Sequence, residues 1–527
     1  MGVGAGRPLP LLALAVLAAA CTTPPGPDTE PAAPSVAPTP ASALRLATSL
    51  PTSLDPRELN TDDGLQVAAQ VFDGLVAYDP TTYDPIPAAA ERWEVEDDGT
   101  RFVFHLRPEM TFHDGSPVRA QDFVFAWNRL ADPLAAAPYA FLLEPVEGFE
   151  EYRREVRVSR LSGVTAPDDL TLEIRLDRPW WDFVSILGHP ALSPVPPGAE
   201  SGTFGSQPVG NGPFSVASTL SPGLPLVLQR FDGYRGTTPS TVTIEYRSFE
   251  RPSEAWPEFL AGDLDVAPIP PALLAEAQSR YGAHGITDLA RLLYCAFDQE
   301  DEAFQDAGLR RAVSLAIGRD VVAADVYGGA AVPAVGIVPP SLPTYRPDRC
   351  AGACARDPEA ARALVERIPR SDRSFALDYP ASPLGDRLAQ TLSAQLADAG
   401  LTVTPRSRDP LELPDVLSDG GHEMFCLVWT ADYPRQQALL EPLLESRSAD
   451  NHANVSDPDL DDLLERGRTE RTPEIRADIY AEVERLALER MHVIPVVWFR
   501  SHLAVRPGIR GFVVDALGRY DAASLSR

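Results

Sequence analysis

The chain has 527 residues, 44% of them hydrophobic, and a formal net charge of −29 at pH 7. This length exceeds what one hydrophobic core supports, so two or more domains are expected, and the apolar content excludes a disordered chain. The acidic charge argues against nucleic acid or an anionic membrane surface as partner, and the absence of Lys, all 46 basic residues being Arg, excludes phosphate-loop and Schiff-base lysines.

Residues 1–20 have the pattern of a signal peptide, because Arg7 precedes an apolar stretch too short to span a bilayer of about 30 Å. Small residues then lead into Cys21, which resembles the lipobox of bacterial lipoproteins, whose Cys is lipidated and becomes the mature N-terminus. Ordinary cleavage beside an incidental Cys is the alternative. Residues 21–42 hold seven prolines and no apolar period, which indicates a tether between a lipid anchor and a folded body.

After the tether, the hydrophobic pattern is that of an α/β protein. Thr61 is suited to cap a helix that has acids in its first turn and an apolar stripe behind them. Apolar residues alternate over residues 102–107, which predicts a half-buried strand. An amphipathic helix is expected through residues 123–130, ending at Asp132.

An apolar run from Met424 to Trp429 ends in the carboxylate of Asp432, which is flanked by aromatic residues. Six apolar residues in succession predict a strand covered on both faces, as in a mostly parallel sheet. Ligands of such sheets bind beyond the carboxyl ends of the strands, so Asp432 is expected at the mouth of a cleft. The alternative is a turn residue whose carboxylate bonds its own backbone.

Four cysteines remain if the first is lipidated. Cys350 and Cys354 can close a small disulfide ring if their loop turns, whereas a metal site would need further ligands and no His lies near. Cys295 and Cys426 lie in apolar strands, where inert buried thiols are favoured over a bridge. Because the His residues show no close pair and no nucleophile elbow or phosphate loop is present, no metal, no cofactor and no catalysis are expected.

Short segments spread along the chain carry a combined pattern: Ala90-Glu91-Arg92-Trp93, Phe112-His113-Asp114-Gly115-Ser116-Pro117, Trp127-Asn128-Arg129-Leu130, Gly210-Asn211-Gly212-Pro213-Phe214, Ala261-Gly262-Asp263-Leu264-Asp265 and Trp429-Thr430-Ala431-Asp432-Tyr433-Pro434. In this order they resemble family 5 of the extracellular solute-binding proteins, the peptide- and oligopeptide-binding components of ABC importers. The resemblance runs from about residue 43 almost to the C-terminus.

The resemblance implies an α/β fold of the type II periplasmic-binding-protein kind, with two lobes joined by two hinge crossover strands. Mapped onto this chain, the first lobe is 43–290 and the second is 291–493. Residues 494–527 then return to complete the first lobe, which is enlarged and discontinuous. The crossover strands are expected near 292–297 and 492–499, both of which are apolar runs.

The resemblance also implies a function. It indicates a lipid-anchored, extracytoplasmic receptor on the outer face of the cytoplasmic membrane, which captures oligopeptides between its lobes and delivers them to an ABC permease. It assigns the α-amine of the peptide to Asp432. Other candidate ligand contacts are Trp429, Tyr433, Tyr139, Asn60, Thr61 and Trp498.

Each of these further candidates has a structural alternative. Asn60 and Thr61 can simply begin and cap a helix, and the aromatic residues can be core. Arg435, beside the proposed site, either receives a ligand carboxylate or is solvated. Three other functions stay open. One is the same fold binding another solute, such as an oligosaccharide or a chelated metal. Another is a secreted peptide hydrolase, for which no activated nucleophile is visible. The last is a signalling receptor that binds its ligand without delivering it.

Overall fold

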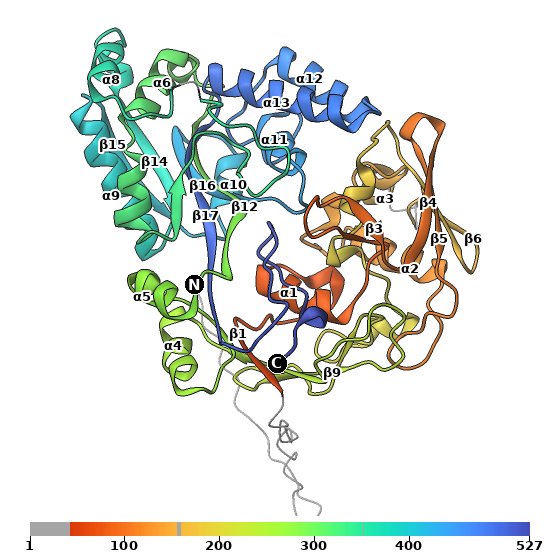
Figure 1. The fold of residues 1–527 in the computed structure, drawn as a ribbon. Coiled ribbons are helices and arrows are strands. Elements are labelled where there is room, and N and C mark those ends of the chain that lie inside the picture. Colours follow the sequence, from red (N-terminus) through yellow and green to blue (C-terminus); the bar gives the residue numbers. More distant parts are fainter. Residues whose placement is uncertain (1–42, 155–159, 351) are drawn as a thin grey trace, which may run out of the picture. The chain divides into compact units, whose positions relative to one another are not determined.

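The structure, a computed structural model, describes residues 43–154, 160–350 and 352–527. The predicted signal peptide, 1–20, and the predicted tether, 21–42 with Cys21, lie outside the described residues. The described part is a mixed α/β structure built on one large sheet and two small ones (Figure 1). None of its helices is long and apolar enough to cross a membrane.

The large sheet has a strand order in which distant parts of the chain become neighbours. Along the sheet the strands are β15 (Thr402–Arg408), β14 (Ser374–Pro380), β16 (Met424–Thr430), β12 (Gly285–Phe297), β17 (Ile494–Val505), β11 (Val266–Pro268), β1 (Leu44–Thr48), β10 (Thr243–Ser248), β9 (Leu226–Arg230) and β8 (Phe214–Val216), and β13 (Ala331–Pro333) pairs with β17. The two long strands β12 and β17 therefore separate strands drawn from residues 374–430 from strands drawn from residues 44–268. The first predicted crossover segment, 292–297, lies in β12, and the second, 492–499, begins two residues before β17 and continues into it.

Two smaller sheets belong to the first half of the chain. The four-stranded sheet consists of β4 (Ala90–Glu96), β5 (Arg101–Leu106), β7 (Thr171–Arg175) and β6 (Val164–Asp168), and the two-stranded sheet of β2 (Val76–Tyr78) and β3 (Pro85–Pro87). Phe102, Phe104 and Leu106 of β5 are buried, as their alternation predicts, and Val103 between them is buried as well.

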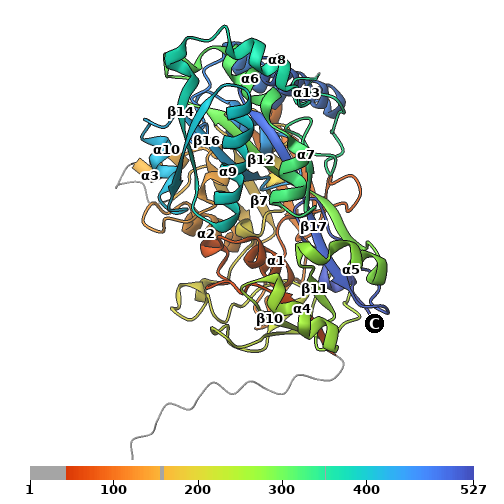
Figure 2. The same cartoon turned by 90° about the vertical axis from the view of Figure 1, so that its left-hand side faces the viewer.

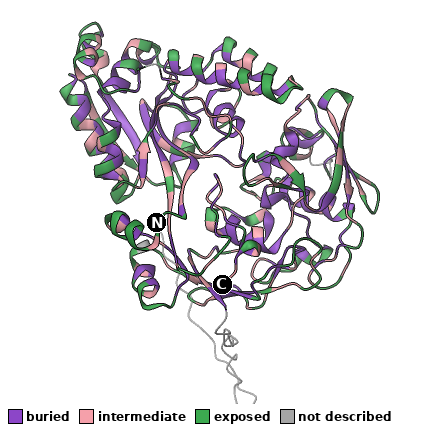
Figure 3. Ribbon diagram, in the orientation of Figure 1, coloured by how far each residue is buried: buried purple, intermediate pink, exposed green. Residues whose placement is uncertain are grey.

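Helices contact both the large sheet and the four-stranded sheet. They are α1 (Asp62–Val71), α2 (Ala120–Ala131), α3 (Phe149–Arg154), α4 (Pro252–Ala261), α5 (Leu274–Tyr281), α6 (Ala307–Ala316), α7 (Arg319–Val321), α8 (Pro358–Val365), α9 (Pro383–Asp398), α10 (Leu413–Ser418), α11 (Gln437–Leu444), α12 (Pro458–Thr469) and α13 (Pro473–Glu489). Helix α9 packs on β14 and β15, whereas α4 contacts β11 and α5 contacts β17 (Figure 2). Buried residues follow the central strands, and exposed ones follow the outer helices (Figure 3).

Strand β16 differs from the expectation of a strand covered on both faces in a mostly parallel sheet. The large sheet is mixed, because β16 pairs antiparallel with β12 and parallel with β14. Strand β14 pairs with β16 only at Met424 and Phe425. Beyond that point β12 is the only recorded strand partner in the described part of the chain, so Val428 is 46% exposed. The apolar run therefore ends in a free strand edge.

Cys295 and Cys426 form a disulfide, so the preference for two inert thiols is wrong. The two residues stand directly opposite each other in the antiparallel register of β12 and β16, with Cα atoms 4.1 Å apart. Each lies in an apolar run, which is why the sequence suggested buried thiols. The register that brings them together joins segments 131 residues apart, and it is fixed only by the fold.

Removing this disulfide should lower the free energy of unfolding by about 2–3 kcal/mol, because the bond closes a long loop in the unfolded chain. The Cys295→Ala/Cys426→Ala double variant avoids a free thiol. Urea unfolding of this variant and of the wild type measures the difference. The Cys350→Ala/Cys354→Ala variant is the matched control, since its loop spans a separation of only 4 residues and should cost less. Equal losses in both variants would contradict the loop-length argument.

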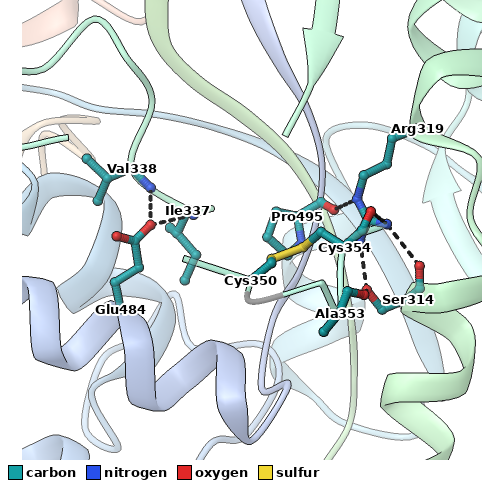
Figure 4. The surroundings of a disulfide bond; sticks show 9 residues. All are labelled: Ser314, Arg319, Ile337, Val338, Cys350, Ala353, Cys354, Glu484 and Pro495. Carbon is teal, nitrogen blue, oxygen red and sulfur yellow. Dashed lines mark hydrogen bonds between the residues drawn. A yellow bond between two sulfur atoms is a disulfide. The ribbon is translucent and has the colours of Figure 1, made fainter. Parts of the chain in front are cut away.

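Cys350 and Cys354 also form a disulfide, in the loop for which a small ring was considered. The buried guanidinium of Arg319 holds this loop against the start of β17 (Figure 4). It donates to the carbonyl oxygens of Cys354 at 2.7 Å and Pro495 at 2.7 Å, and to the Ser314 hydroxyl at 2.8 Å. Burial without a carboxylate partner lowers the pKa of Arg319 to about 9. The ring is therefore a structural element of the region around α7.

Candidate functional site

Asp432 follows the free end of β16 by two residues and is half-buried. Its carboxylate makes no ion pair and no side-chain hydrogen bond with any residue that the structure describes. Burial raises its pKa to about 7, the Arg519 charge opposes this shift, and Asp450 and Asp62 add to it. An acid that is removed from water without a partner is costly, and a bound cation would relieve that cost.

The backbone around Asp432 is fixed by β12. The register between β12 and β17 is interrupted between Asp288 and Leu292, which frees Ala290 for other partners. Its carbonyl accepts from the Ala431 amide at 2.9 Å, and its amide donates to the Ala516 carbonyl at 2.6 Å. Residue 290 therefore joins the loop that carries Asp432 to the C-terminal segment.

The N-terminus of α1 reaches the same place. Arg291 donates to the Thr430 hydroxyl at 2.9 Å and forms an ion pair with Asp62. Thr61 caps α1 by accepting from the Gly64 amide at 3.1 Å, and Asn60 is exposed just before it. Asp62, which follows the predicted residues Asn60 and Thr61, is thus the residue that connects this segment to the site.

Tyr139 lies close to Asp432 and packs against a buried histidine. Its ring centroid is 4.4 Å from that of His189. Burial raises the Tyr139 pKa to about 12, and the nearby Asp432 adds to the shift. Burial likewise lowers the pKa of His189 well below its usual value, so this ring is neutral. Tyr139 therefore packs against His189 and lies near the carboxylate of Asp432, and its contact with a ligand stays a prediction.

The remaining aromatic candidates lie deeper. Trp429 is half-buried and donates from Nε1 to the Ala438 carbonyl at 2.8 Å, which ties it to α11. Tyr433 is 7% exposed and Trp498 is 3% exposed. The Trp498 ring packs against Tyr345, with centroids 5.9 Å apart. Tyr433 and Trp498 thus take the core position that the sequence left as their alternative.

Arg435 is not solvated. It forms ion pairs with Asp84 at 3.0 Å and with Asp182 at 3.3 Å, and 12% of its side chain is exposed. Asp182 also accepts from Gln437 at 3.0 Å, and it lies 3.8 Å from the guanidinium of Arg476. The segment that follows Asp432 is in this way fastened to residues from the first half of the chain.

Sequence reasoning missed four residues of the site, namely Arg291, Arg519, Asp450 and His189. Arg291 had a local signal, because it stands at the start of the apolar run 292–297. The others had none, since only long-range contacts bring them to Asp432. In the described part of the chain, no group of three or more His, Cys, Asp or Glu residues is arranged to hold a metal ion.

Solved structures with the same fold are numerous. The MppA murein tripeptide-binding protein in its unliganded open form has a TM-score of 0.77 at 22% identity, over 92% of this chain and 97% of that one. The clavulanic acid biosynthesis oligopeptide binding protein 2 has a TM-score of 0.81 at 23% identity, over 92% and 95%. These structures confirm the predicted type II periplasmic-binding-protein fold.

Sequence comparison gives relatives along nearly the same length. A probable deoxycholate-binding periplasmic protein, YgiS of Escherichia coli, is 28% identical over 88% of this chain and 89% of its own. The periplasmic oligopeptide-binding protein OppA of Salmonella typhimurium is 27% identical over 87% of each. The family model described as "Bacterial extracellular solute-binding proteins, family 5 Middle" matches residues 84–451. The chain therefore belongs to family 5 of the bacterial extracellular solute-binding proteins, as the resemblance predicted.

Proposed function

We propose that the protein captures oligopeptides in a cleft between two lobes and delivers them to the membrane permease of an ABC importer. The first lobe is residues 43–290 completed by 494–527, and the second is 291–493. Family membership and the names of relatives such as OppA support this function. The observation that carries it is the half-buried carboxylate of Asp432, which has no partner among the described residues.

A free peptide offers two features that do not depend on its side chains. Its ammonium group can pair with Asp432, and its backbone can add to a strand edge. The outer edge of β16 beyond Phe425 has no recorded strand partner in the described part of the chain. It ends beside Asp432, so a peptide anchored by its amine can extend along this edge.

The protein is proposed to reach the membrane through a lipid on Cys21 after removal of residues 1–20. Residues 21–42 would then act as the spacer, because a Pro-rich segment extends by about 3.1 Å per residue. Metabolic labelling with a fatty acid tests this proposal in the wild type and in Cys21→Ala. Equal labelling of the two forms would refute it.

The ligand class is tested by mass spectrometry of whatever co-purifies with the protein. Free peptides of mixed sequence are expected. Recovery of a sugar or a chelated metal instead would favour another solute. A bile acid is tested separately, because YgiS is described as a probable deoxycholate-binding protein. The carboxylate of a bile acid would be repelled by Asp432. Cleavage of the recovered peptides during incubation would indicate a hydrolase, which is not expected.

Peptide affinity should fall about 15- to 20-fold between about pH 7.5 and about pH 5.5. The pKa of Asp432 in the free protein is raised to about 7, so at lower pH the site holds a neutral acid. Pairing with an ammonium requires the carboxylate, so binding must release a proton and weakens as pH falls. Above about pH 8 the peptide amine itself loses its proton.

Isothermal titration calorimetry (ITC) in buffers of different ionisation enthalpy measures both the affinity and the proton release. The neighbouring charged groups, Arg519, Asp450 and Asp62, set this pKa together with burial. In Asp432→Asn the affinity should be low and flat over the range. An unchanged pH profile in that variant would show that another group titrates.

A further inference from the structure

The guanidinium group of Arg519 has no partner among the described residues. It is half-buried, yet its side chain makes no ion pair and no hydrogen bond with any residue that the structure describes. Other buried arginines are saturated: Arg129 by Asp55 and Glu200, Arg319 by carbonyl oxygens, and Arg468 by glutamates. An unpaired guanidinium that is partly removed from water is an available site for an anion.

The backbone that carries Arg519 is rigid. The Asp515 carboxylate accepts from the Arg519 amide at 2.8 Å and from the Leu517 amide at 2.9 Å, and the Asp515 amide donates to the Arg519 carbonyl at 2.8 Å. Gly518 takes φ +79° inside this turn. Both side-chain bonds of the turn end on Oδ1 of Asp515, and this carboxylate lies near the guanidinium without forming an ion pair with it.

Backbone hydrogen bonds to Ala290 bring the segments of Arg519 and Asp432 together. The turn 515–519 is bonded to one side of that residue at Ala516, and the Asp432 loop is bonded to its other side at Ala431. The charges of Arg519 and Asp432 influence each other, but the two groups make no direct ion pair. The two side chains therefore lie near each other without direct contact.

Two uncharged side chains lie close to both charges. Tyr139 interacts electrostatically with both Asp432 and Arg519, and the neutral ring of His189 packs behind it. Tyr139 and His189 add no charge of their own, whereas Asp62 and Asp450 add negative charge near Asp432. A charge that is partly removed from water gains more from an ion pair than a charge in bulk solvent. Each of the two opposite charges gains most from a ligand group of its own.

We propose that Arg519 binds a carboxylate of the same ligand whose ammonium is bound by Asp432, so the site favours ligands that carry both groups a short distance apart. The inference rests on the proposed peptide-binding function and specifies its substrate class. An extended dipeptide spans about 7 Å between its termini, and an N-terminal Asp or Glu holds its side-chain carboxylate closer still to its own amine. A longer peptide with neither feature leaves Arg519 unpaired.

ITC with four defined probes tests this assignment in the wild type and in Arg519→Gln. The probes are Ala-Ala, Ala-Ala amide, Asp-Ala-Ala amide and N-acetyl-Ala-Ala. The wild type should bind Ala-Ala about 10- to 100-fold more tightly than its amide, and Arg519→Gln should lose that preference. Arg519→Lys, which keeps the charge, should retain part of it. Arg311→Gln, on the exposed face of α6, is the matched control and should behave as the wild type.

The probes separate the sources of the carboxylate and the two proposals. A gain confined to Asp-Ala-Ala amide assigns Arg519 to the side chain of the first residue, and a gain with Ala-Ala assigns it to the α-carboxylate. The role of Arg519 is overturned if the wild type binds Ala-Ala and its amide equally and gains no affinity from the Asp side chain. It is also overturned if Arg519→Gln weakens the binding of all probes alike. The amine anchor stands in both cases. If N-acetyl-Ala-Ala binds as tightly as Ala-Ala, the amine anchor on which the proposed function rests is refuted.

Discussion

Replacing Asp432 with Asn should lower the affinity for amine-bearing peptides about 30- to 1000-fold, which corresponds to about 2–4 kcal/mol. Asn keeps the shape and loses the charge, so the ligand ammonium would be desolvated without a counter-ion. The variant should be at least as stable as the wild type, because the native carboxyl is held half-buried without a partner, with its pKa raised to about 7 by burial. A loss of affinity without a loss of stability would separate binding from folding.

ITC with a defined tripeptide measures the affinity, and urea unfolding measures the stability. Asp419→Asn is a suitable control, because Asp419 is exposed at the end of α10 in the same proposed lobe. Peptide affinity within threefold of the wild type in Asp432→Asn would refute the amine anchor. The peptide would then have to be held by the edge of β16 alone.

Replacing Arg468 with Met should lower the free energy of unfolding by about 3–5 kcal/mol. The side chain of Arg468 is 2% exposed and lies 3.2 Å from carboxylate oxygens of both Glu441 and Glu465, and it also pairs with Glu445. Met fills most of the volume but leaves these acids without their cation. Glu441 bears the greatest cost, because burial already raises its pKa.

Urea unfolding of Arg468→Met is compared with Arg466→Met on the same helix, whose side chain is 59% exposed and should matter little. A second substitution, Glu441→Gln, should restore part of the lost stability by removing the uncompensated buried charge. A loss below about 1 kcal/mol in Arg468→Met would mean that water or a shift of α12 solvates the acids in its absence.

Local patterns in the sequence were sufficient to predict the elements with strong periodicity. The cap at Thr61, the strand around Phe104 and the end of α2 before Asp132 follow from side-chain chemistry within a few residues. The family resemblance supplied the two-lobed topology, which no local pattern contains. The mixed character of the large sheet was missed, because an apolar run such as β16 does not reveal whether its neighbours are parallel or where they end.

Of the candidate site, the sequence pattern itself marked only Asp432. Asp432 stands out because a charge interrupts a long apolar run. No comparable sequence pattern marks Arg519. Its place at the site depends on the hydrogen bonds that join Ala516, Ala290 and Ala431. The disulfide between Cys295 and Cys426 was missed for the same reason, since strand register is a property of the assembled sheet.

The disulfide between β12 and β16 restricts where the long strands can bend. It fastens one end of β12 to β16. If the strands from residues 374–430 rotate against those from residues 44–268, the backbone of β12 must therefore bend elsewhere along its length. The interruption in its register between Asp288 and Leu292 offers the needed backbone freedom. Ala290, which carries the loops of both Asp432 and Arg519, lies inside this interval. A rotation of the strands from residues 374–430 against those from residues 44–268 would therefore change the distance between the charges of Asp432 and Arg519. The distance between these charges that a ligand meets then depends on the angle of that rotation.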